Sequence, residues 1–235
     1  METLTGQCDH PPGKEETHDR ILQAAERLFS DKGFEATSVR DITTEADCNV
    51  ASVNYHFGGK ENLYLETFRS LLSEVRDRRI ESMRRDMAEK PDMSLEDFVE
   101  SFATAFMEPL VDLSRGRFFL GFFSHEMNDP HLPPRVFVDE FIRPLAEVSI
   151  EGFERFGPPM EPMVQRLCLM SIVGQLLHAI KARVLFAEDR EPVMVPSDLE
   201  EHVRHIIRFS AGGIRACADS EAVAQREPPT KEVEP

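Results

Sequence analysis

The side chains with the most evident binding chemistry lie in a polar stretch between residues 37 and 60. At helical spacing, Val50, Ser52, Asn54 and Tyr55 fall on one face of a short segment. The amide group of Asn54 can pair with both polar atoms of an adenine edge, and Val50 can pack against a thymine methyl group. A good bidentate pair discriminates between bases by about 1–3 kcal/mol. This face therefore has the chemistry needed to read the major groove of DNA.

A first short helix must precede this face. Ser38 and Asp41 match the capping-box pattern, in which each side chain accepts a hydrogen bond from the backbone N–H group of the other residue. Val39, Ile42 and Ala46 then recur at helical spacing and form one apolar stripe. The pattern predicts a helix that starts after Ser38 and buries this stripe.

A second helix is predicted from Val50 to Phe57. Asn49 is a suitable N-cap, and Val53 and Phe57 lie one turn apart on the inner face. The glycines at 58 and 59 end the helix because glycine tolerates positive φ values. A helix of this length fits the major groove, which is about 12 Å wide, so the two helices together predict a helix-turn-helix.

The charge balance constrains how such a unit can hold DNA. The chain carries 27 lysine and arginine residues against 43 aspartate and glutamate residues, a formal net charge of −16. DNA-binding proteins usually present a basic surface, and the first 70 residues are themselves acidic. Phosphate contacts must then come from a few local cations, helix N-termini and hydroxyl groups such as those of Thr37 and Ser38. The alternative for these two hydroxyl groups is that they only cap the helix.

Three spaced motifs extend the pattern over residues 17–65. They are Ile21-Leu22-x-Ala24-Ala25-x-x-Leu28-Phe29-x-x-x-Gly33-Phe34, Thr37-Ser38-Val39-Arg40-Asp41-Ile42 and Tyr55-His56-Phe57-x-x-Lys60-Glu61-x-Leu63. Together they closely resemble the N-terminal domain of the TetR family of one-component transcriptional regulators. The resemblance implies phosphate or groove contacts by Ser52, Tyr55, His56 and Lys60, and base contacts by Val50, Ala51 and Asn54. The predicted DNA-binding set is Thr37, Ser38, Asn49, Val50, Ala51, Ser52, Asn54, Tyr55, His56 and Lys60.

The remainder of the chain shows helical periodicity and no useful alternating strand pattern, so the predicted fold is all-α. An N-terminal three-helix helix-turn-helix domain is followed by a larger helical domain for ligand binding and dimerisation. Helices are expected at about 17–32, 60–90, 94–112, 115–127, 133–156, 162–187 and 197–216. The predicted domains are a disordered arm at 1–16, the helix-turn-helix domain at 17–65, the effector-binding and dimerisation domain at 66–217, and a disordered tail at 218–235.

A looser resemblance concerns the larger domain. Glu126-Met127-x-Asp129-Pro130, Ile142-Arg143-Pro144 and Gly174-Gln175 are similar to the branch of TetR regulators with a CecR-like C-terminal domain. Aromatic and apolar side chains with a few polar ones have the usual make-up of a small-molecule site. The candidate ligand-binding residues are Phe102, Phe106, Arg117, Phe119, Phe122, Phe123, Met127, Gln175 and His178. For any one of them, packing in the core is an equally good explanation.

The last two helices suit a dimer interface. The segment 162–187 has little polar surface and more apolar surface than one flank of a small domain needs. The TetR resemblance implies a four-helix bundle with two helices from each subunit. The candidate interface residues are Val164, Leu167, Ser171, Gly174, Ile206 and Phe209. The alternative is that this surface is buried wholly within one chain.

Other classes of function find little support in the sequence. His125-Glu126 lacks the second histidine of a zinc-binding HExxH helix, and neither a glycine-rich phosphate loop nor a GxSxG turn occurs. The four cysteines show no CxxC spacing, so neither a zinc site nor a disulfide framework is indicated. From these absences together we expect no catalytic residue, no metal and no cofactor. Cys48 lies beside the predicted DNA surface and is either a redox switch or a small packing residue. No apolar run approaches the ~18 residues of a membrane span, so we expect a cytoplasmic protein without a membrane partner.

These observations lead to one hypothesis and one alternative. The hypothesis is a ligand-responsive regulator, a repressor, that binds a palindromic double-stranded DNA operator as a homodimer and is released by a small, largely apolar effector. The alternative is a helical dimer that acts as a small-molecule or lipid sensor, or as a protein-interaction module, with weak or no DNA binding. The acidic N-terminal segment is the observation that supports the alternative.

Overall fold

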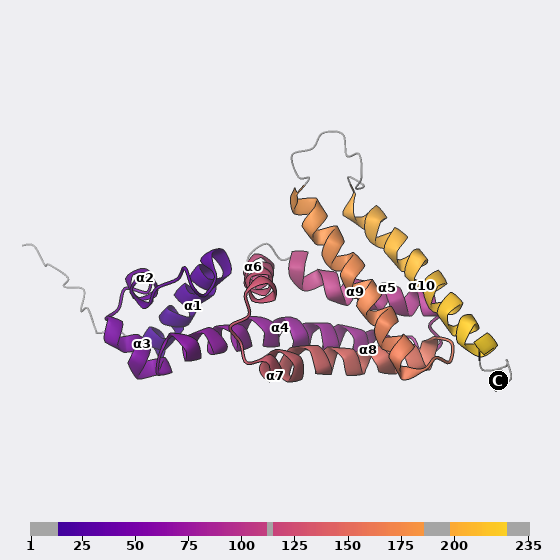
Figure 1. The fold of residues 1–235 in the computed structure, drawn as a ribbon, viewed down its shortest axis with the longest axis horizontal. Helices are drawn as coiled ribbons and strands as arrows, with labels where there is room; N and C mark the ends of the chain where they lie inside the picture. Colours follow the sequence, from indigo (N-terminus) through magenta and orange to yellow (C-terminus); the bar gives the residue numbers. More distant parts are fainter. Residues whose placement is uncertain (1–13, 112–114, 186–197, 225–235) are drawn as a thin grey trace, which may run out of the picture. The chain divides into compact units, whose positions relative to one another are not determined.

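The computed structural model describes residues 14–111, 115–185 and 198–224. Within these ranges the chain forms α-helices and one π-helix and no β-strand (Figure 1), which confirms the predicted all-α fold. The helices form two compact units. Of the described residues, the helix-turn-helix unit comprises 14–73 and 115–134, and the C-terminal unit comprises 74–111, 135–185 and 198–224.

The helix-turn-helix unit is organised around a cluster of aromatic rings. The Tyr64 ring stacks on Phe122 with 4.6 Å between ring centroids and meets Phe29 edge-on at 4.9 Å. All three rings are almost completely buried, and they join α1 (Lys14–Lys32), α4 (Lys60–Glu89) and α6 (Arg115–Asn128) in one aromatic cluster. The other helices of this unit are α2 (Val39–Glu45) and α3 (Val50–Phe57), and only the first part of α4 belongs to it.

The helix α6 belongs to this compact unit, although the sequence pattern placed it in the domain at 66–217. It packs on α1, and a Cβ atom on Gly121 would lie 2.3 Å from the carbonyl oxygen of Ser30. Only glycine allows the two helices to approach this closely. The compact unit that contains the helix-turn-helix is therefore larger than the predicted range 17–65.

The C-terminal unit has its own apolar core. The rings of Phe98 and Phe153 meet edge-on at 5.3 Å, and a Cβ atom on Gly152 would lie 2.0 Å from the Phe98 ring. In Figure 1, α9 and α10 lie side by side, and both pack against α5. The elements of this unit, besides the second part of α4, are α5 (Leu95–Val111), α7 (Pro134–Phe137), the π-helix η1 (Val138–Ile142), α8 (Arg143–Phe156), α9 (Pro162–Leu185) and α10 (Leu199–Ala224).

The helix predicted at 133–156 is interrupted by the π-helix. Pro144 has no N–H group, so the carbonyl oxygen of Glu140 cannot accept the usual i to i−4 hydrogen bond. The N–H group of Arg143 instead donates to the carbonyl oxygen of Val138, and the side chain of Arg76 donates to the Glu140 carbonyl oxygen at 2.7 Å. A proline and one external donor thus account for the change of helix type.

Two helix ends differ from the prediction. The first helix begins at Lys14 and not at residue 17, so the expected disordered arm is wrong for residues 14–16, while residues 1–13 lie outside the described part of the chain. The last helix continues to Ala224, so the expected disordered tail is wrong for residues 218–224. Alanine is the strongest helix former, and Ala218, which is buried, extends the apolar face of α10.

Candidate nucleic-acid interface

The predicted capping box fixes the start of α2. The backbone N–H group of Asp41 donates to the Ser38 hydroxyl at 3.1 Å, and the backbone N–H group of Ser38 donates to Asp41 Oδ2 at 3.0 Å. The Ser38 hydroxyl also donates to Asp41 Oδ2 at 2.6 Å. Hydrogen bonds from the Ser38 hydroxyl and backbone hold the pKa of Asp41 below its usual range. The Ser38 hydroxyl therefore caps α2, and it must turn away from Asp41 before it can donate to a phosphate.

Thr37 does not belong to the DNA-facing surface, which corrects the sequence prediction. Its side chain is fully buried, and its hydroxyl donates to the carbonyl oxygen of Gly33 at 2.7 Å and lies 3.2 Å from that of Leu28. These carbonyl groups stand at the C-terminal end of α1, where helices leave carbonyl oxygens without an intrahelical partner. Thr37 therefore fastens the α1–α2 turn and does not bind phosphate.

The recognition helix candidate, α3, is fixed at both ends. Asn49 Oδ1 accepts a 2.9 Å hydrogen bond from the N–H group of Ala51, as predicted for an N-cap. Gly58 adopts φ 78° and donates its N–H group to the carbonyl oxygen of Asn54 at 3.0 Å. Val53 and Phe57 are buried on the inner face. Both caps and the inner anchors match the sequence prediction.

The outer face of α3 is available to a partner. Val50 is 50% exposed and Tyr55 is 70% exposed, so this face presents an apolar and an aromatic side chain to solvent. Ala51 and Asn54 are also exposed, and Ser52 is half-buried. The structure thus places four of the predicted contact residues, Val50, Ala51, Asn54 and Tyr55, on the exposed side of α3, whereas Ser52 is half-buried.

Basic side chains border this face. The ammonium group of Lys60 lies 3.9 Å from the centroid of the Phe34 ring, and that of Lys14 lies 5.1 Å from the centroid of the Tyr55 ring. Burial, together with the nearby His18 and Lys14, lowers the pKa of His56. At neutral pH His56 is therefore an uncharged hydrogen-bonding group. Lys14 was missed from the sequence because the helix start was placed three residues too late, whereas His18 lies inside the predicted helix and was not singled out.

Several other cations of this unit are already engaged. Arg27 forms a 2.5 Å ion pair with Glu45, and Arg20 donates to the backbone carbonyl oxygen of Asp47 at 3.3 Å. Arg40 lies exposed on α2, the helix that precedes the recognition helix candidate. The cations available to phosphates on this side of the unit are thus few, as the acidic sequence indicated.

Cys48, in the turn between α2 and α3, is half-buried. Burial raises the pKa of its thiol, although a hydrogen bond with Ser52 and the charge of Arg20 act in the opposite direction. Because the thiolate is the reactive form, a raised pKa lowers the reactivity of a cysteine toward oxidants. This environment favours the packing role of Cys48 over the redox role.

The candidate ligand-binding residues are divided between the two units. Phe122 stacks on Tyr64 in the aromatic core of the helix-turn-helix unit, so its burial needs no ligand. In the same unit, Phe119 stacks on Phe123 at 5.7 Å, whereas Arg117 and Met127 are exposed.

The remaining candidates lie in the C-terminal unit. Phe102 and Phe106 are buried on α5, the Gln175 amide lies 3.4 Å from the Ser210 hydroxyl, and His178 is exposed.

The sequence prediction missed Arg79, whose buried guanidinium group lies 4.0 Å from the Phe106 ring centroid and donates to the Phe106 carbonyl oxygen. Burial lowers the pKa of Arg79 to about 9. Periodicity gave no signal for it because Arg79 lies among other charged residues.

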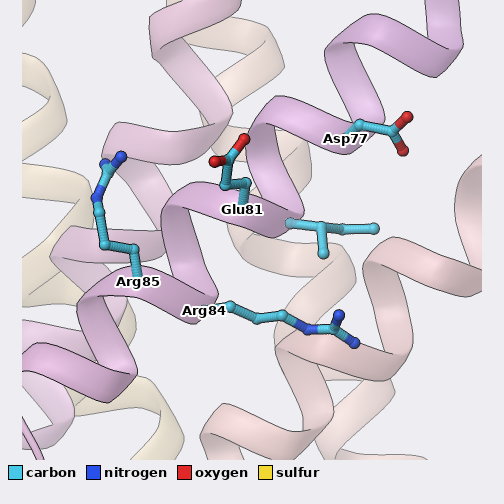
Figure 2. A pocket seen from close by; sticks show the side chains of 5 residues that line it. Asp77, Glu81, Arg84 and Arg85 are labelled. Carbon is cyan, nitrogen blue, oxygen red and sulfur yellow. The ribbon is translucent and has the colours of Figure 1, made fainter.

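A hollow of about 530 Å³ lies along α4 in the C-terminal unit (Figure 2). It is lined by Asp77, Ile80, Glu81, Arg84 and Arg85, none of which was predicted to bind a ligand. Four of these five side chains are charged and exposed. The composition differs from that of a site for an apolar effector.

The predicted dimer face is exposed along most of its length. Leu167 is 58% exposed and Phe209 is 63% exposed, and nothing lies within 4 Å of a Cβ atom placed on Gly174. Ser171 is exposed and Val164 is half-buried. Ile206 is only 2% exposed and packs in the core of the C-terminal unit, so its prediction as an interface residue is wrong.

The apolar composition of α9 can be explained in two ways. By length and hydropathy alone, Pro162–Ala182 could also cross a membrane. Core helices of soluble proteins pass the same test, and Leu169, Ile172 and Leu176 of α9 are buried in the core of the C-terminal unit. The apolar composition of α9 is thus accounted for by this core and by the exposed Leu167 face.

Family models match both parts of the chain. Residues 21–67 match the model of bacterial regulatory proteins of the tetR family, and residues 92–214 match the C-terminal domain of the HTH-type transcriptional dual regulator CecR. The second match alone covers more than half of the chain.

Curated relatives match over the N-terminal segment. The regulator YttP of Bacillus subtilis is 50% identical over 50 residues, which are 21% of this chain and 24% of YttP. The HTH-type transcriptional repressor KstR2 of Mycolicibacterium smegmatis is 38% identical over 64 residues, which are 27% of this chain and 31% of KstR2. The chain thus spans less than a third of the length of each of these relatives.

Solved structures share the fold over most of the chain. A TetR family transcription regulator from Marinobacter aquaeolei VT8 has a TM-score of 0.63 at 19% identity and covers 85% of this chain and 96% of its own. The regulator FadR of Bacillus subtilis, solved in complex with stearoyl-CoA, has a TM-score of 0.60 at 17% identity and covers 84% and 99%. The matched proteins are transcriptional regulators and not enzymes. The chain therefore belongs to the TetR family of transcriptional regulators, with a CecR-type C-terminal domain.

Proposed function

We propose that the protein is a homodimeric repressor that reads a palindromic operator with the exposed face of α3. The observation that carries this proposal is the exposed face formed by Val50, Ala51, Asn54 and Tyr55 on a helix that is capped at both ends. A rigid, short helix with an exposed amide and small apolar groups is suited to base contacts in the major groove. Relatives that share the N-terminal segment include proteins named as repressors, such as KstR2.

The scarcity of cations near α3 determines how phosphates would be held. Lys14, Arg40 and Lys60 are the cations expected to contact the DNA backbone, joined by helix N-termini and by the Tyr55 hydroxyl. Each neutralised phosphate contributes about −0.9 to the slope of log K against log salt concentration. Three cations from each of two subunits would give a slope of about −5. Affinity for unrelated DNA is then low, and base contacts determine binding.

Dimerisation would occur through the exposed faces of α9 and α10. Leu167 and Phe209 are large apolar side chains that remain more than half exposed in the single chain. A second copy would cover them by forming a four-helix bundle. The two recognition helices would then lie about 34–36 Å apart, or a multiple of this distance, to match successive major grooves.

The proposed effector is small and largely apolar, and it binds in the C-terminal unit. Phe102 and Phe106 supply buried aromatic surface there, and FadR of Bacillus subtilis, which shares the fold, was solved with stearoyl-CoA. An effector releases the operator only through its difference in affinity for the DNA-bound and free forms. The protein would act where the operator DNA is, in the cytoplasm.

Selection from a pool of genomic DNA fragments at low salt tests this proposal. The wild-type chain is compared with a Tyr55→Ala, Lys60→Ala double variant and with a Lys90→Ala control, which removes an exposed lysine from the C-terminal unit. We expect the wild type and the control to enrich one palindromic site, and the double variant to lose that enrichment. Failure of a folded wild-type dimer to enrich any fragment would contradict operator binding by the free protein.

A second candidate function is favoured by the acidic charge. With a net charge of −16 and few cations near α3, the protein could be a helical dimer that senses a small molecule or lipid, or binds another protein, without DNA. Two results together would support this alternative: no binding to any DNA fragment at low ionic strength, and a co-purified ligand detected by native mass spectrometry.

A further inference from the structure

His131 faces the turn between α1 and α2 within the helix-turn-helix unit. Its ring packs on Phe34 with 4.5 Å between centroids, and its Nε2 lies 3.1 Å from a carboxylate oxygen of Glu35. Its Nδ1 lies 2.8 Å from the carbonyl oxygen of Asp129. Both partners are acceptors only, so each ring nitrogen needs a hydrogen to complete its bond. The geometry is thus satisfied by the imidazolium form of the ring.

The backbone that carries this ring is anchored to a buried carboxylate. Glu126 is 6% exposed and accepts hydrogen bonds from the N–H groups of His131 at 3.1 Å and Leu132 at 2.9 Å. It also accepts the Tyr64 hydroxyl hydrogen bond at 2.9 Å. Glu126 therefore holds the backbone of the segment after α6 against the core of the unit. The His131 ring, on the same segment, contacts Glu35 in the turn between α1 and α2.

The charged groups around His131 favour its protonated form. The carboxylates of Glu35 and Asp129 lie 3.1 and 3.8 Å from Nε2, and the only cation close to its stacking partner, among the described contacts, is Lys60 over the Phe34 ring. Burial alone would lower the pKa of His131, but the hydrogen bonds to Asp129 and Glu35 and their negative charges outweigh it, and the pKa is raised. Glu126 and Tyr64 face the ring from α6 and α4 as hydrogen-bonded partners of one another.

The turn contacted by His131 leads directly into α2. Glu35 follows Gly33 and Phe34, and the Thr37 hydroxyl is bonded to the Gly33 carbonyl oxygen just before α2 begins. We propose that His131 is a positioning residue for the helix-turn-helix: as an imidazolium it ties residues 129–132 to the turn at Gly33–Glu35, and on losing its proton it gives up one of its two ring hydrogen bonds and the charge attraction to Glu35, which loosens the turn. The contact itself is independent of the proposed function, whereas its effect on operator binding rests on that function.

The direction of the pH effect follows from the raised pKa. The contact stabilises the turn fully below the ordinary histidine pKa of about 6.5, and this stabilisation is lost as the pH rises through the higher pKa of the folded protein. Each unit by which the pKa is raised corresponds to about a tenfold change in the ratio of closed to open turn. At alkaline pH the turn that leads into α2 would therefore be held less firmly.

An NMR titration of the histidine Cε1–Hε1 resonances in the full chain measures the first step. His131→Gln assigns the resonance, and Glu35→Gln removes the carboxylate charge at a residue that is exposed, so the fold is retained. We expect the His131 pKa to exceed 6.5 in the wild type and to fall in the Glu35→Gln variant, with no change in a Glu61→Gln control. A His131 pKa that is the same in all three proteins would overturn the proposal.

Amide hydrogen exchange of residues 33–38 measures the positioning itself. After correction for the intrinsic pH dependence of exchange, we expect wild-type protection to fall between pH 6 and 8.5, and the Glu35→Gln variant to show low protection already at pH 6. Loss of protection by the same factor at every pH in the variant would indicate a merely structural contact and would overturn the positioning role. Because neither measurement uses DNA, absence of operator binding would sink the proposed function and leave this result standing.

Discussion

The Tyr64 hydroxyl donates a 2.9 Å hydrogen bond to the Glu126 carboxylate, 62 residues further along the chain. Burial and the charge of Glu126 raise the pKa of Tyr64 far above its usual range, so its hydroxyl remains a donor at every working pH. Because Glu126 also accepts backbone N–H groups from the segment after α6, this one carboxylate joins α4, α6 and that segment. It is a buried polar link between distant segments of the helix-turn-helix unit.

Replacement of Glu126 by glutamine should destabilise the protein. The carboxylate accepts only, whereas a glutamine amide would turn an N–H₂ group toward donors and leave one of them without a partner. We expect a loss of about 2–3 kcal/mol in the free energy of unfolding, measured by urea denaturation, and a smaller loss of about 1–2 kcal/mol for Tyr64→Phe. A Glu61→Gln control at an exposed position should change it by less than about 0.5 kcal/mol. A Glu126→Gln variant as stable as this control would refute the role of the carboxylate.

Replacement of Gly121 by alanine should separate α6 from α1. The added methyl group would overlap the Ser30 carbonyl oxygen, which cannot move without displacing α1. Overpacking of this kind costs about 1–3 kcal/mol, which thermal or urea unfolding would detect. Gly212→Ala is the matched control: nothing lies within 4 Å of its Cβ position, and alanine in a helix is favoured by about 0.5–1 kcal/mol. Equal effects of the two substitutions would show that α1 and α6 are not in close contact.

The Leu167→Asp substitution should prevent dimerisation while leaving the single chain folded. Leu167 is already exposed, so Leu167→Asp removes no core packing, but it would place a charge in the proposed four-helix bundle. We expect a shift from dimer to monomer in sedimentation equilibrium, with unchanged helix content by circular dichroism. Thr104→Asp, at an exposed position on α5, should remain dimeric. A Leu167→Asp variant that remains dimeric would place the interface elsewhere.

Cys48 should react more slowly than Cys217. The Cys48 thiol is half-buried and its pKa is raised by burial, so little thiolate is present at pH 7–8, whereas Cys217 is exposed. Alkylation with iodoacetamide, followed by peptide mass spectrometry, should label Cys217 several times faster, and Cys217→Ser and Cys48→Ser variants identify each signal. Faster labelling of Cys48 would revive the redox-switch reading.

The parts of the fold that follow from local chemistry were predictable from the sequence. The capping box of Ser38 and Asp41, the Asn49 cap and the αL residue Gly58 each depend on residues within one or two helical turns. The buried inner face and the exposed outer face of α3 follow from the helical spacing of its apolar residues. For this reason the caps and the two faces of α3 could be predicted from the sequence, while contact of the outer face with DNA stays a prediction.

The parts that failed depend on distant or subtle contacts. The packing of α6 on α1 is decided by Gly121 and Ser30, which are 91 positions apart, and no local pattern encodes it. Thr37 was predicted to face DNA because a hydroxyl before a helix looks the same whether it points outward or, as here, toward the end of α1. Ile206 was placed in the interface because periodicity does not distinguish a core stripe from an adjoining subunit surface.

The base preference of an Asn54→Ala variant tests the central claim most directly. The selection from genomic fragments is repeated with this variant and with Asn128→Ala, which removes an exposed amide at the end of α6. If the outer face of α3 reads the operator, Asn54→Ala will lose discrimination at one position in each half-site, by about 1–3 kcal/mol, and Asn128→Ala will keep it. An Asn54→Ala variant that enriches the wild-type site with undiminished preference at every position would contradict the account.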